Sequence, residues 1–195
     1  MERLSALPIT PAVIGLLGTV VAVMLFAGIF VLVRTRASRS IPNKLRTVGR
    51  GLLTSVLLPD GEGGQVFVDY ILLTSRGITI IDYRDTAGHV FGSKGMRDWT
   101  VLGRGRRTFA NPLPLLYDRI AAVRRVVPDV PVYGVVAFSE RAQFSKGFPP
   151  DVVMFEAFLQ MLSTAAAAQA TGSPDPAVLD ESWKKLRSAT GRSSV

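Results

Sequence analysis

Hydrophobic and polar residues alternate in two consecutive segments near the middle of the chain, residues 65–74 and 77–84. Side chains of a strand alternate between the two faces of a sheet, so both segments are predicted to be strands. The turn between them, residues 74–77, ends in Gly77, which supplies the positive φ that a tight turn needs. This hairpin and a third candidate strand at residues 88–91 form the centre of the predicted fold.

The hairpin register places two acidic side chains opposite each other. Counting outward from the turn pairs Asp69 with Asp82, and Arg84 shares a face with Asp82 because strand side chains alternate. Opposed side chains in antiparallel strands have Cβ atoms about 5 Å apart, and like charges at that distance repel. We therefore expect a positive group between the carboxylates. It is either a divalent cation, since carboxylate oxygens suit magnesium or manganese, or the guanidinium group of Arg84.

Similar patterns predict elements on both sides of the hairpin. Residues 52–58 and 98–102 are candidate strands, and residues 103–107 form a loop rich in glycine and arginine. Asn111 followed by Pro112 predicts the start of a helix, because the Asn side chain can accept a free backbone N–H and proline has none to leave unpaired. The apolar stripe of this helix consists of Leu116, Ile120, Val123 and Val127.

The last part of the chain is predicted to alternate between strands and helices. Residues 132–138, VYGVVAF, are nearly all apolar, which is typical of a strand buried on both faces of a parallel or mixed sheet. Residues 152–155 are a further candidate strand, and residues 156–170 a helix. From Asp175 a final amphipathic helix is expected to cover the core, with a membrane surface or a protein partner as alternatives. Residues 188–195 are expected to be disordered.

An uncharged apolar segment at residues 12–33 predicts a single transmembrane helix. Its only polar side chain is Thr19, and Arg34 follows it directly, where a cleaved signal peptide would have small residues. Gly18 and Ala22 have the spacing that lets transmembrane helices pair, which leaves open a homodimer or a complex with another membrane protein.

Basic residues are concentrated after this segment. Arg3 is the only basic residue before it, whereas six follow: Arg34, Arg36, Arg39, Lys44, Arg46 and Arg50. Because positively charged flanks stay in the cytoplasm, the folded part is predicted to be cytoplasmic and the protein to be a single-pass protein of the plasma (inner) membrane. The same flank could contact anionic lipid head groups. The candidate residues for that contact are Arg34, Arg36, Arg39, Lys44 and Arg46.

Composition narrows the possible chemistry. The 23 Lys and Arg residues against 15 Asp and Glu residues give a net charge of +8, which favours an anionic partner such as nucleic acid or an anionic membrane. The absence of cysteine excludes disulfides, thiol catalysis and cysteine-ligated zinc, and the single histidine excludes most histidine metal sites. The loop at residues 103–107 could bind phosphate or could simply be solvated. Its candidate anion-binding residues are Arg104, Arg106 and Arg107.

Several motifs occur in an order that resembles a known family. In chain order they are Asp69 on a strand, the triplet Asp82-Tyr83-Arg84, the segment GHVFG at residues 88–92, Trp99, and Asn111-Pro112 at a helix start. This order resembles the nuclease-related domain, NERD, a family of the restriction-endonuclease-like PD-(D/E)xK nucleases, over about residues 52–162. The resemblance implies metal-dependent phosphodiester hydrolysis, with Asp69, Asp82 and Arg84 as catalytic residues and the two aspartates as metal ligands.

The chain also departs from the family pattern. Asp82 stands where the family usually has Glu, Arg84 where it has Lys, and Leu115 where its NPxxQ motif has Gln. No acidic residue occurs between Glu2 and Asp60, so a glutamate-bearing helix before the sheet is missing. Arginine stays protonated and differs from lysine in reach. Two interpretations follow: a catalytically weak or inactive domain that binds nucleic acid or another anionic partner, with Arg84 in place of metal, or an active metal-dependent nuclease.

The sequence thus predicts an α/β fold, a restriction-endonuclease-like mixed sheet flanked by helices, plus one N-terminal transmembrane helix. The predicted parts are a short N-terminal segment at residues 1–11, the transmembrane helix at 12–33, a basic juxtamembrane linker at 34–50, the NERD-like domain at 51–170, and a C-terminal amphipathic helix and tail at 171–195.

Overall fold

The computed structural model describes residues 40–167 and 173–192. Two compact units are present, Met1–Ile41 and Pro42–Val195, and the architecture below belongs to the second. The predicted transmembrane helix at residues 12–33 lies outside the described residues. Within the described ranges, no helix has the length and hydrophobicity needed to cross a membrane. Three candidate membrane-surface residues also lie outside these ranges: Arg34, Arg36 and Arg39.

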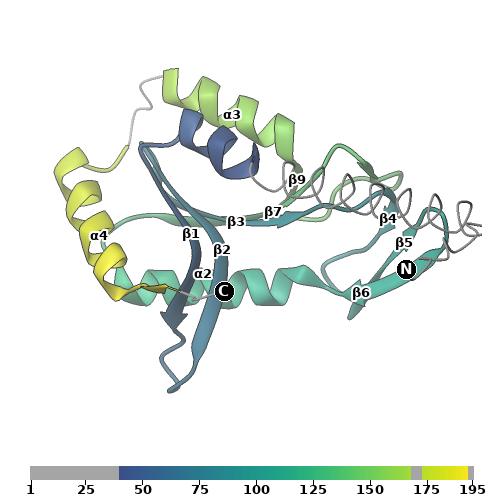
Figure 1. Ribbon diagram of the computed structural model, residues 1–195, viewed down its shortest axis with the longest axis horizontal. Coiled ribbons are helices and arrows are strands. Elements are labelled where there is room, and N and C mark those ends of the chain that lie inside the picture. Colours follow the sequence, from purple (N-terminus) through teal and green to yellow (C-terminus); the bar gives the residue numbers. More distant parts are fainter. Residues whose placement is uncertain (1–39, 168–172, 193–195) are drawn as a thin grey trace, which may run out of the picture. The chain divides into compact units, whose positions relative to one another are not determined.

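A mixed sheet of six strands forms the centre of the second unit (Figure 1). Its strands, in spatial order, are β10 (Gly191–Arg192), β1 (Gly51–Pro59), β2 (Gln65–Thr74), β3 (Gly77–Arg84), β7 (Val132–Phe138) and β9 (Val152–Met154). β10, β1, β2 and β3 are antiparallel to one another in turn, whereas β3, β7 and β9 run parallel. The predicted mixed α/β fold with a central hairpin is confirmed.

Helices cover both faces of this sheet. In the described ranges they are α2 (Pro112–Val126), α3 (Phe155–Ala167), α4 (Pro176–Ala189) and a short helical segment at residues 40–48. Figure 1 shows α2 on one face of the sheet and α3 on the other, next to residues 42–48. α2 begins as predicted, because the Asn111 side chain accepts the N–H of Leu113 and Pro112 occupies the first turn.

The β2–β3 hairpin has the predicted register. Pairing begins at the turn, where Gly77 has a φ of 135°, and continues as far as Tyr70 opposite Ile81. The next residues outward on the two strands are Asp69 and Asp82. The two acids are therefore neighbours at the point where regular pairing of β2 with β3 ends.

β2 leaves β3 at this point but stays with β1. The β1–β2 ladder continues to Pro59 opposite Gln65 and is interrupted at Ser55, which lies across from Asp69 and has a φ of 52°. Beyond the interruption β1 and β2 curve past α2, and both strands contact that helix (Figure 1). This bend places the β2 backbone within reach of α2 side chains.

The larger apolar core lies between the sheet and α2. On the sheet it includes Ile71, Ile78 and Ile80, and on α2 it includes Leu116 and Val123, all of them fully buried. The alternation predicted for β3 explains why two isoleucines and Asp82 point to this face. The core thus surrounds an acidic side chain.

On the opposite face, residues 40–48 form a helix, which corrects the predicted linker at residues 34–50 for that part. Leu45 is fully buried, and Lys44 forms an ion pair with Glu156 of α3. Residues 40–48 therefore include a helix that packs as part of the fold. Ile41 and Leu45 are both buried and Val48 is partly buried, a spacing typical of one helix face, but over only nine residues this pattern was too short to be recognised in the sequence.

A second, smaller sheet has the strand order β6-β5-β4-β8. Its strands are β4 (Gly88–Phe91), β5 (Asp98–Leu102), β6 (Arg106–Ala110) and β8 (Ala142–Gln143). Trp99 is fully buried, and its ring lies 6.4 Å from that of Phe138 on the central sheet. β6 corrects the prediction of a loop at residues 103–107: Arg106 and Arg107 pair with β5, and the strand was missed because its side chains are mostly exposed and polar.

The C-terminal segment closes one side of the larger core. Asp175 caps α4 by accepting the N–H of Ala177, and Leu179 and Leu186 are buried in the α2-side core. The expectation that this helix covers the core is confirmed. The expectation that residues 188–195 are disordered is wrong for the part the structure describes, because α4 extends to Ala189 and β10 pairs with β1.

Candidate functional site

Asp69 and Asp82 lie on the face of the central sheet that α2 covers. The Asp82 side chain is 2% exposed, whereas that of Asp69 is 35% exposed. The difference follows from the bend: Asp82 stays inside the sheet, while Asp69 lies where β2 turns away from β3. One carboxylate is therefore buried and the other is open to solvent on one side.

Arg119 of α2 brings a guanidinium group to both acids. Its Nη1 lies 2.9 Å from Oδ2 of Asp82, and its Nη2 lies 3.5 Å from Oδ2 of Asp69. Its Nε donates a hydrogen bond of 2.7 Å to the backbone oxygen of Phe67, on the part of β2 that has left β3. Arg119 thus connects the two acids and the diverging strand.

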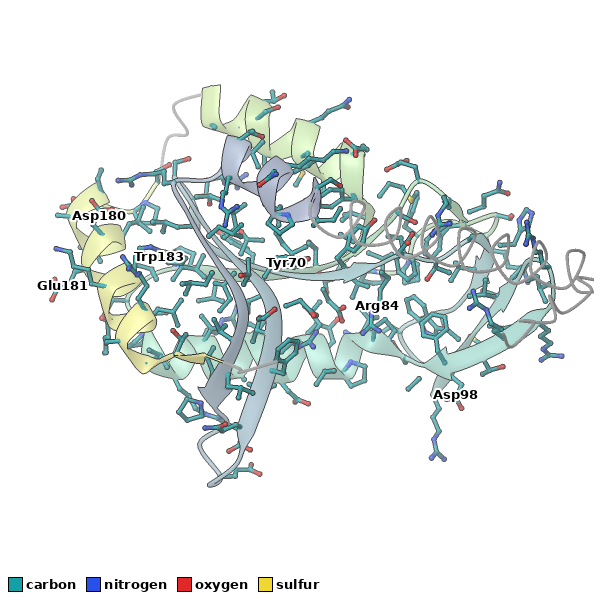
Figure 2. All side chains as sticks on the ribbon, in the orientation of Figure 1. Tyr70, Arg84, Asp98, Asp180, Glu181 and Trp183 are labelled. Atoms are coloured by element: carbon teal, nitrogen blue, oxygen red, sulfur yellow. The ribbon has the colours of Figure 1, made fainter. Side chains whose placement is uncertain are left out.

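Arg84 contributes the second cation. Its Nη2 donates a hydrogen bond of 2.8 Å to Oδ2 of Asp82. Figure 2 shows Arg84 on the α2 side of the sheet, and its side chain is 36% exposed. The expectation that Arg84 pairs with both aspartates is wrong in part, because Arg84 contacts Asp82 and it is Arg119 that contacts both.

Two carboxylates and two guanidinium groups make the cluster electrically balanced. Its hydrogen bonding is incomplete: Nε of Arg84 and Nη1 of Arg119 are buried donors without a hydrogen-bond acceptor. For Arg119 the oxygen of Asp82 is near, but it lies outside hydrogen-bonding geometry. The Arg84 side chain is partly exposed as a whole, but its unpaired Nε is buried, so both unpaired donors lie inside the cluster.

Burial raises the pKa of the Asp69 carboxyl group above its ordinary value of 3.8. The charge of Arg119 acts in the opposite direction, the nearby Asp82 raises the pKa further, and Arg84 lowers it. Burial therefore outweighs the neighbouring arginines. The ionised form of Asp69 is therefore less stable in this site than that of a free aspartate.

These residues do not suit a divalent cation. Magnesium and manganese prefer a shell of about six oxygen ligands, whereas the site offers two carboxylates that already face Arg119 and Arg84. A cation between Asp69 and Asp82 would occupy the region that the Arg119 guanidinium fills. Among the residues that the structure describes, no group of three or more His, Asp or Glu side chains is close enough together to hold a metal ion.

In the comparison with protein-family models, the nuclease-related domain matches residues 35–139, which is more than half of the chain. The chain belongs to the nuclease-related domain (NERD) family. Comparisons with curated proteins and with solved structures give no match.

The NERD match differs in extent from the resemblance seen in the sequence. It begins at residue 35, well before residue 52, so it includes the helix at residues 40–48. It ends at residue 139, so β9, α3, α4 and β10 lie beyond it. The acid–arginine cluster lies entirely inside the match.

The NERD helix start fixes the loop between β4 and β5. The Asn111 side-chain amide donates hydrogen bonds to the backbone oxygens of Lys94 (3.1 Å) and Met96 (2.8 Å), while its oxygen caps α2. Leu115 is 42% exposed and lies one helical turn before Arg119 on the same side of α2. The position at which the sequence resemblance leads us to expect an amide thus carries an exposed apolar side chain.

The candidate anion-binding arginines lie on the smaller sheet. Arg104 is in the turn between β5 and β6, and Arg106 and Arg107 begin β6; all three are exposed. Of the described membrane-surface candidates, Lys44 pairs with Glu156, and Arg46 donates to the Asn43 side chain at 3.2 Å. Lys44 therefore has a structural ion pair in addition to any contact with lipid.

Arg119 is the functional residue that the sequence patterns missed. It is not one of the four residues of the predicted apolar stripe, and charged residues outside such a stripe usually face solvent. The spacing nevertheless indicates that Arg119 faces the core, because it lies three residues after Leu116 and four before Val123, and both belong to the apolar stripe. A charged residue inside such a stripe requires a buried partner.

Proposed function

We propose that this protein is a membrane-anchored NERD-domain protein that binds nucleic acid from the cytoplasmic side and is catalytically weak or inactive. The observation that carries the proposal is the position of the Arg119 guanidinium, which contacts Asp69 and Asp82 where a nuclease would need a metal ion. The charge of both acids is already neutralised from within the chain. With the guanidinium group in this position, we expect no metal ion to bind between the acids and activate water.

The smaller sheet supports the choice of nucleic acid as the partner. Residues 88–110 and 141–150, which make up this sheet and its loops, contain seven basic residues and a single acid, Asp98. Aromatic rings accompany the positive charge: Nζ of Lys146 lies 5.9 Å from the centroid of the Phe91 ring, and Phe148 is 55% exposed. Basic grooves with aromatic side chains are typical of single-strand binding.

The membrane assignment rests on the sequence of the N-terminal part. An uncharged run at residues 12–33 with a basic flank favours an anchor whose following domain faces the cytoplasm. The domain would then meet RNA or DNA close to the membrane surface.

Binding and cleavage should be measured on the full-length chain in lipid nanodiscs. We expect a labelled single-stranded oligonucleotide to bind with strong salt dependence, as measured by fluorescence anisotropy, because phosphate contacts release counterions. Arg106→Gln with Arg107→Gln should weaken binding about tenfold and reduce the salt slope by about 2, since each lost phosphate contact lowers the slope by about 1. Lys184→Gln with Lys185→Gln on α4 is the matched control with the same charge loss and should bind normally.

Cleavage is assayed on the same samples with manganese present. The proposal predicts intact oligonucleotide after prolonged incubation. Metal-dependent cleavage that disappears on Asp69→Asn would establish the active nuclease instead, with Asp69, Asp82 and Arg84 in catalytic roles. Absence of salt-dependent binding, or equal loss in the control variant, would contradict the nucleic-acid partner.

A further inference from the structure

Within residues 40–167 and 173–192, the first half of β7 forms an open edge of the central sheet. β9 pairs with β7 only at its last three residues, Val136–Phe138. Residues 132–135 pair with β3 on one side, and none of the described strands pairs with them on the other. An unpaired strand edge is a template for a further strand.

Backbone groups at this edge are available at Gly134. At one end Val136 donates its N–H to the backbone oxygen of Asp151 (2.8 Å), and at the other the oxygen of Val132 accepts from Arg124 (2.9 Å). Alternate residues of a strand direct their backbone groups to the same edge. Gly134, midway between them, therefore directs its N–H and C=O outward.

A cavity of about 780 Å³ borders this edge. α2 and α3 supply its two sides, and the β7 edge lies between them. Tyr133 on β7 is 46% exposed and Met161 on α3 is 55% exposed, which corrects the expectation that β7 is buried on both faces. The groove is thus apolar and has an unpaired strand between its walls.

The charges at the two ends of the groove differ. The groove is lined by three arginines, Arg76, Arg124 and Arg125. Arg124 lies at the end of the groove next to Val132, whose backbone oxygen it binds. Among the described residues, no carboxylate forms an ion pair with any of these three arginines. Asp151, at the opposite end, accepts a hydrogen bond from the Tyr117 hydroxyl.

We propose that this groove binds an extended segment of a partner protein as an added strand on β7. Its backbone pairs with Gly134, alternate apolar side chains pack on Tyr133 and Met161, and an acidic side chain lies at the end marked by Arg76 and Arg124. Main-chain pairing supplies affinity in such strand addition, and side-chain pockets supply specificity.

Charge favours a separate acidic partner over a second copy of this chain. If two copies paired through this edge around a twofold axis near Gly134, the same surface would be used twice. The arginine end of each copy would then face the Asp151 end of the other, but each groove is lined by three arginines and one carboxylate, and this excess of positive charge opposes association. An acidic segment would neutralise the excess.

Selection from a displayed library of random ten-residue peptides tests the site on the full-length chain in lipid nanodiscs. We expect enrichment of peptides that alternate apolar and polar residues and carry Asp or Glu at one end. A selected peptide should bind Met161→Asp and Arg76→Glu at least tenfold more weakly. Arg187→Glu on α4 is the matched control and should bind normally, and unchanged urea unfolding midpoints verify that the variants are folded.

N-methylation of the selected peptide tests the added strand itself. Methyl groups on the N–H groups along one edge of the peptide should abolish binding, while methyl groups on the other edge should not. The proposal would be overturned if both N-methylation patterns left binding unchanged. It would also be overturned if selection on the wild-type chain enriched no peptides relative to selection on Met161→Asp. A dimer of the chain that dissociates in Met161→Asp without peptide would assign the groove to a second copy.

Discussion

Replacing Arg119 with methionine is expected to destabilise the fold by about 3–5 kcal/mol, the usual effect of removing one partner of a buried ion pair. The Arg119 side chain is 6% exposed and that of Asp82 is 2% exposed, so solvent cannot replace the lost charge. Methionine has a similar length and can fill the apolar part of the space. The predicted loss is therefore electrostatic in origin.

Two lost interactions contribute to the expected decrease in the free energy of unfolding. Asp82 keeps Arg84, which is 36% exposed and provides a single hydrogen bond. The backbone oxygen of Phe67 also loses its donor, and hydrogen bonds to charged groups contribute about 1.5–3 kcal/mol each. These effects overlap, since all of them involve one guanidinium group. A loss of 3–5 kcal/mol is a large part of the roughly 5–15 kcal/mol that stabilises a typical domain.

Urea unfolding of the full-length chain in lipid vesicles measures this loss. Trp99 and Trp183 are the only tryptophans, and both pack against the larger core, so their fluorescence reports its unfolding. Figure 2 shows Trp183 on α4 directed toward the sheet. Arg187→Met on the exposed side of α4 is the control and should change stability by less than about 0.5 kcal/mol.

A double-mutant cycle separates the charge interaction from packing. Asp82→Asn in the Arg119→Met background should cost less than Asp82→Asn alone, with an interaction energy of at least about 1 kcal/mol. An Arg119→Met variant that loses less than about 1 kcal/mol and shows no interaction with Asp82 would refute the buried ion pair as a structural element.

Three further expectations follow from the same structure. Because the folded-state pKa of Asp69 is raised, its contribution to stability is greatest below about pH 4 and is lost as the pH rises through the raised value. Asp69→Asn should therefore gain stability relative to the parent from about pH 4 to pH 7 in urea titrations. A stability difference that does not change with pH would contradict this expectation. Leu45→Asp should lower the urea midpoint strongly, since it buries an unpaired charge in the helix of residues 40–48, and an unchanged midpoint would contradict the packing of that helix. A cysteine replacing Ser5 should react with an impermeant thiol reagent on intact cells and one replacing Ser173 only after lysis; the reverse pattern would contradict the cytoplasmic assignment.

The central hairpin could be predicted because several signals agree there. Alternation in β2 and β3 defines the faces, and Gly77 at the turn fixes the register, so Asp69 and Asp82 follow as neighbours. Local patterns of this kind need no information from distant parts of the chain. The helix start at Asn111 was predictable for the same reason.

Elements stabilised by distant contacts could not be predicted. β6 is an edge strand with mostly exposed side chains, and β10 has two residues that form a strand only through pairing with β1. Neither contains an alternating apolar pattern. The helix at residues 40–48 depends on burial of Leu45 and on the ion pair of Lys44 with α3.

The identity of the cation at the acid pair also depends on a distant element. Arg84 was the natural candidate because it is two residues from Asp82 on the same face. Arg119 comes from α2, and its position depends on how that helix crosses the sheet and on the bend of β2 after Asp69. Sequence spacing can place a residue on a helix face but does not specify which strand residue that face meets.

Manganese titration of the full-length chain in lipid vesicles, followed by electron paramagnetic resonance of the free ion, tests the central claim most directly. The account predicts that wild type and Asp69→Asn leave the same concentration of free manganese, because Arg119 already neutralises the acid pair. A saturable site in wild type that disappears in Asp69→Asn would contradict it and would show that a metal ion displaces the guanidinium group.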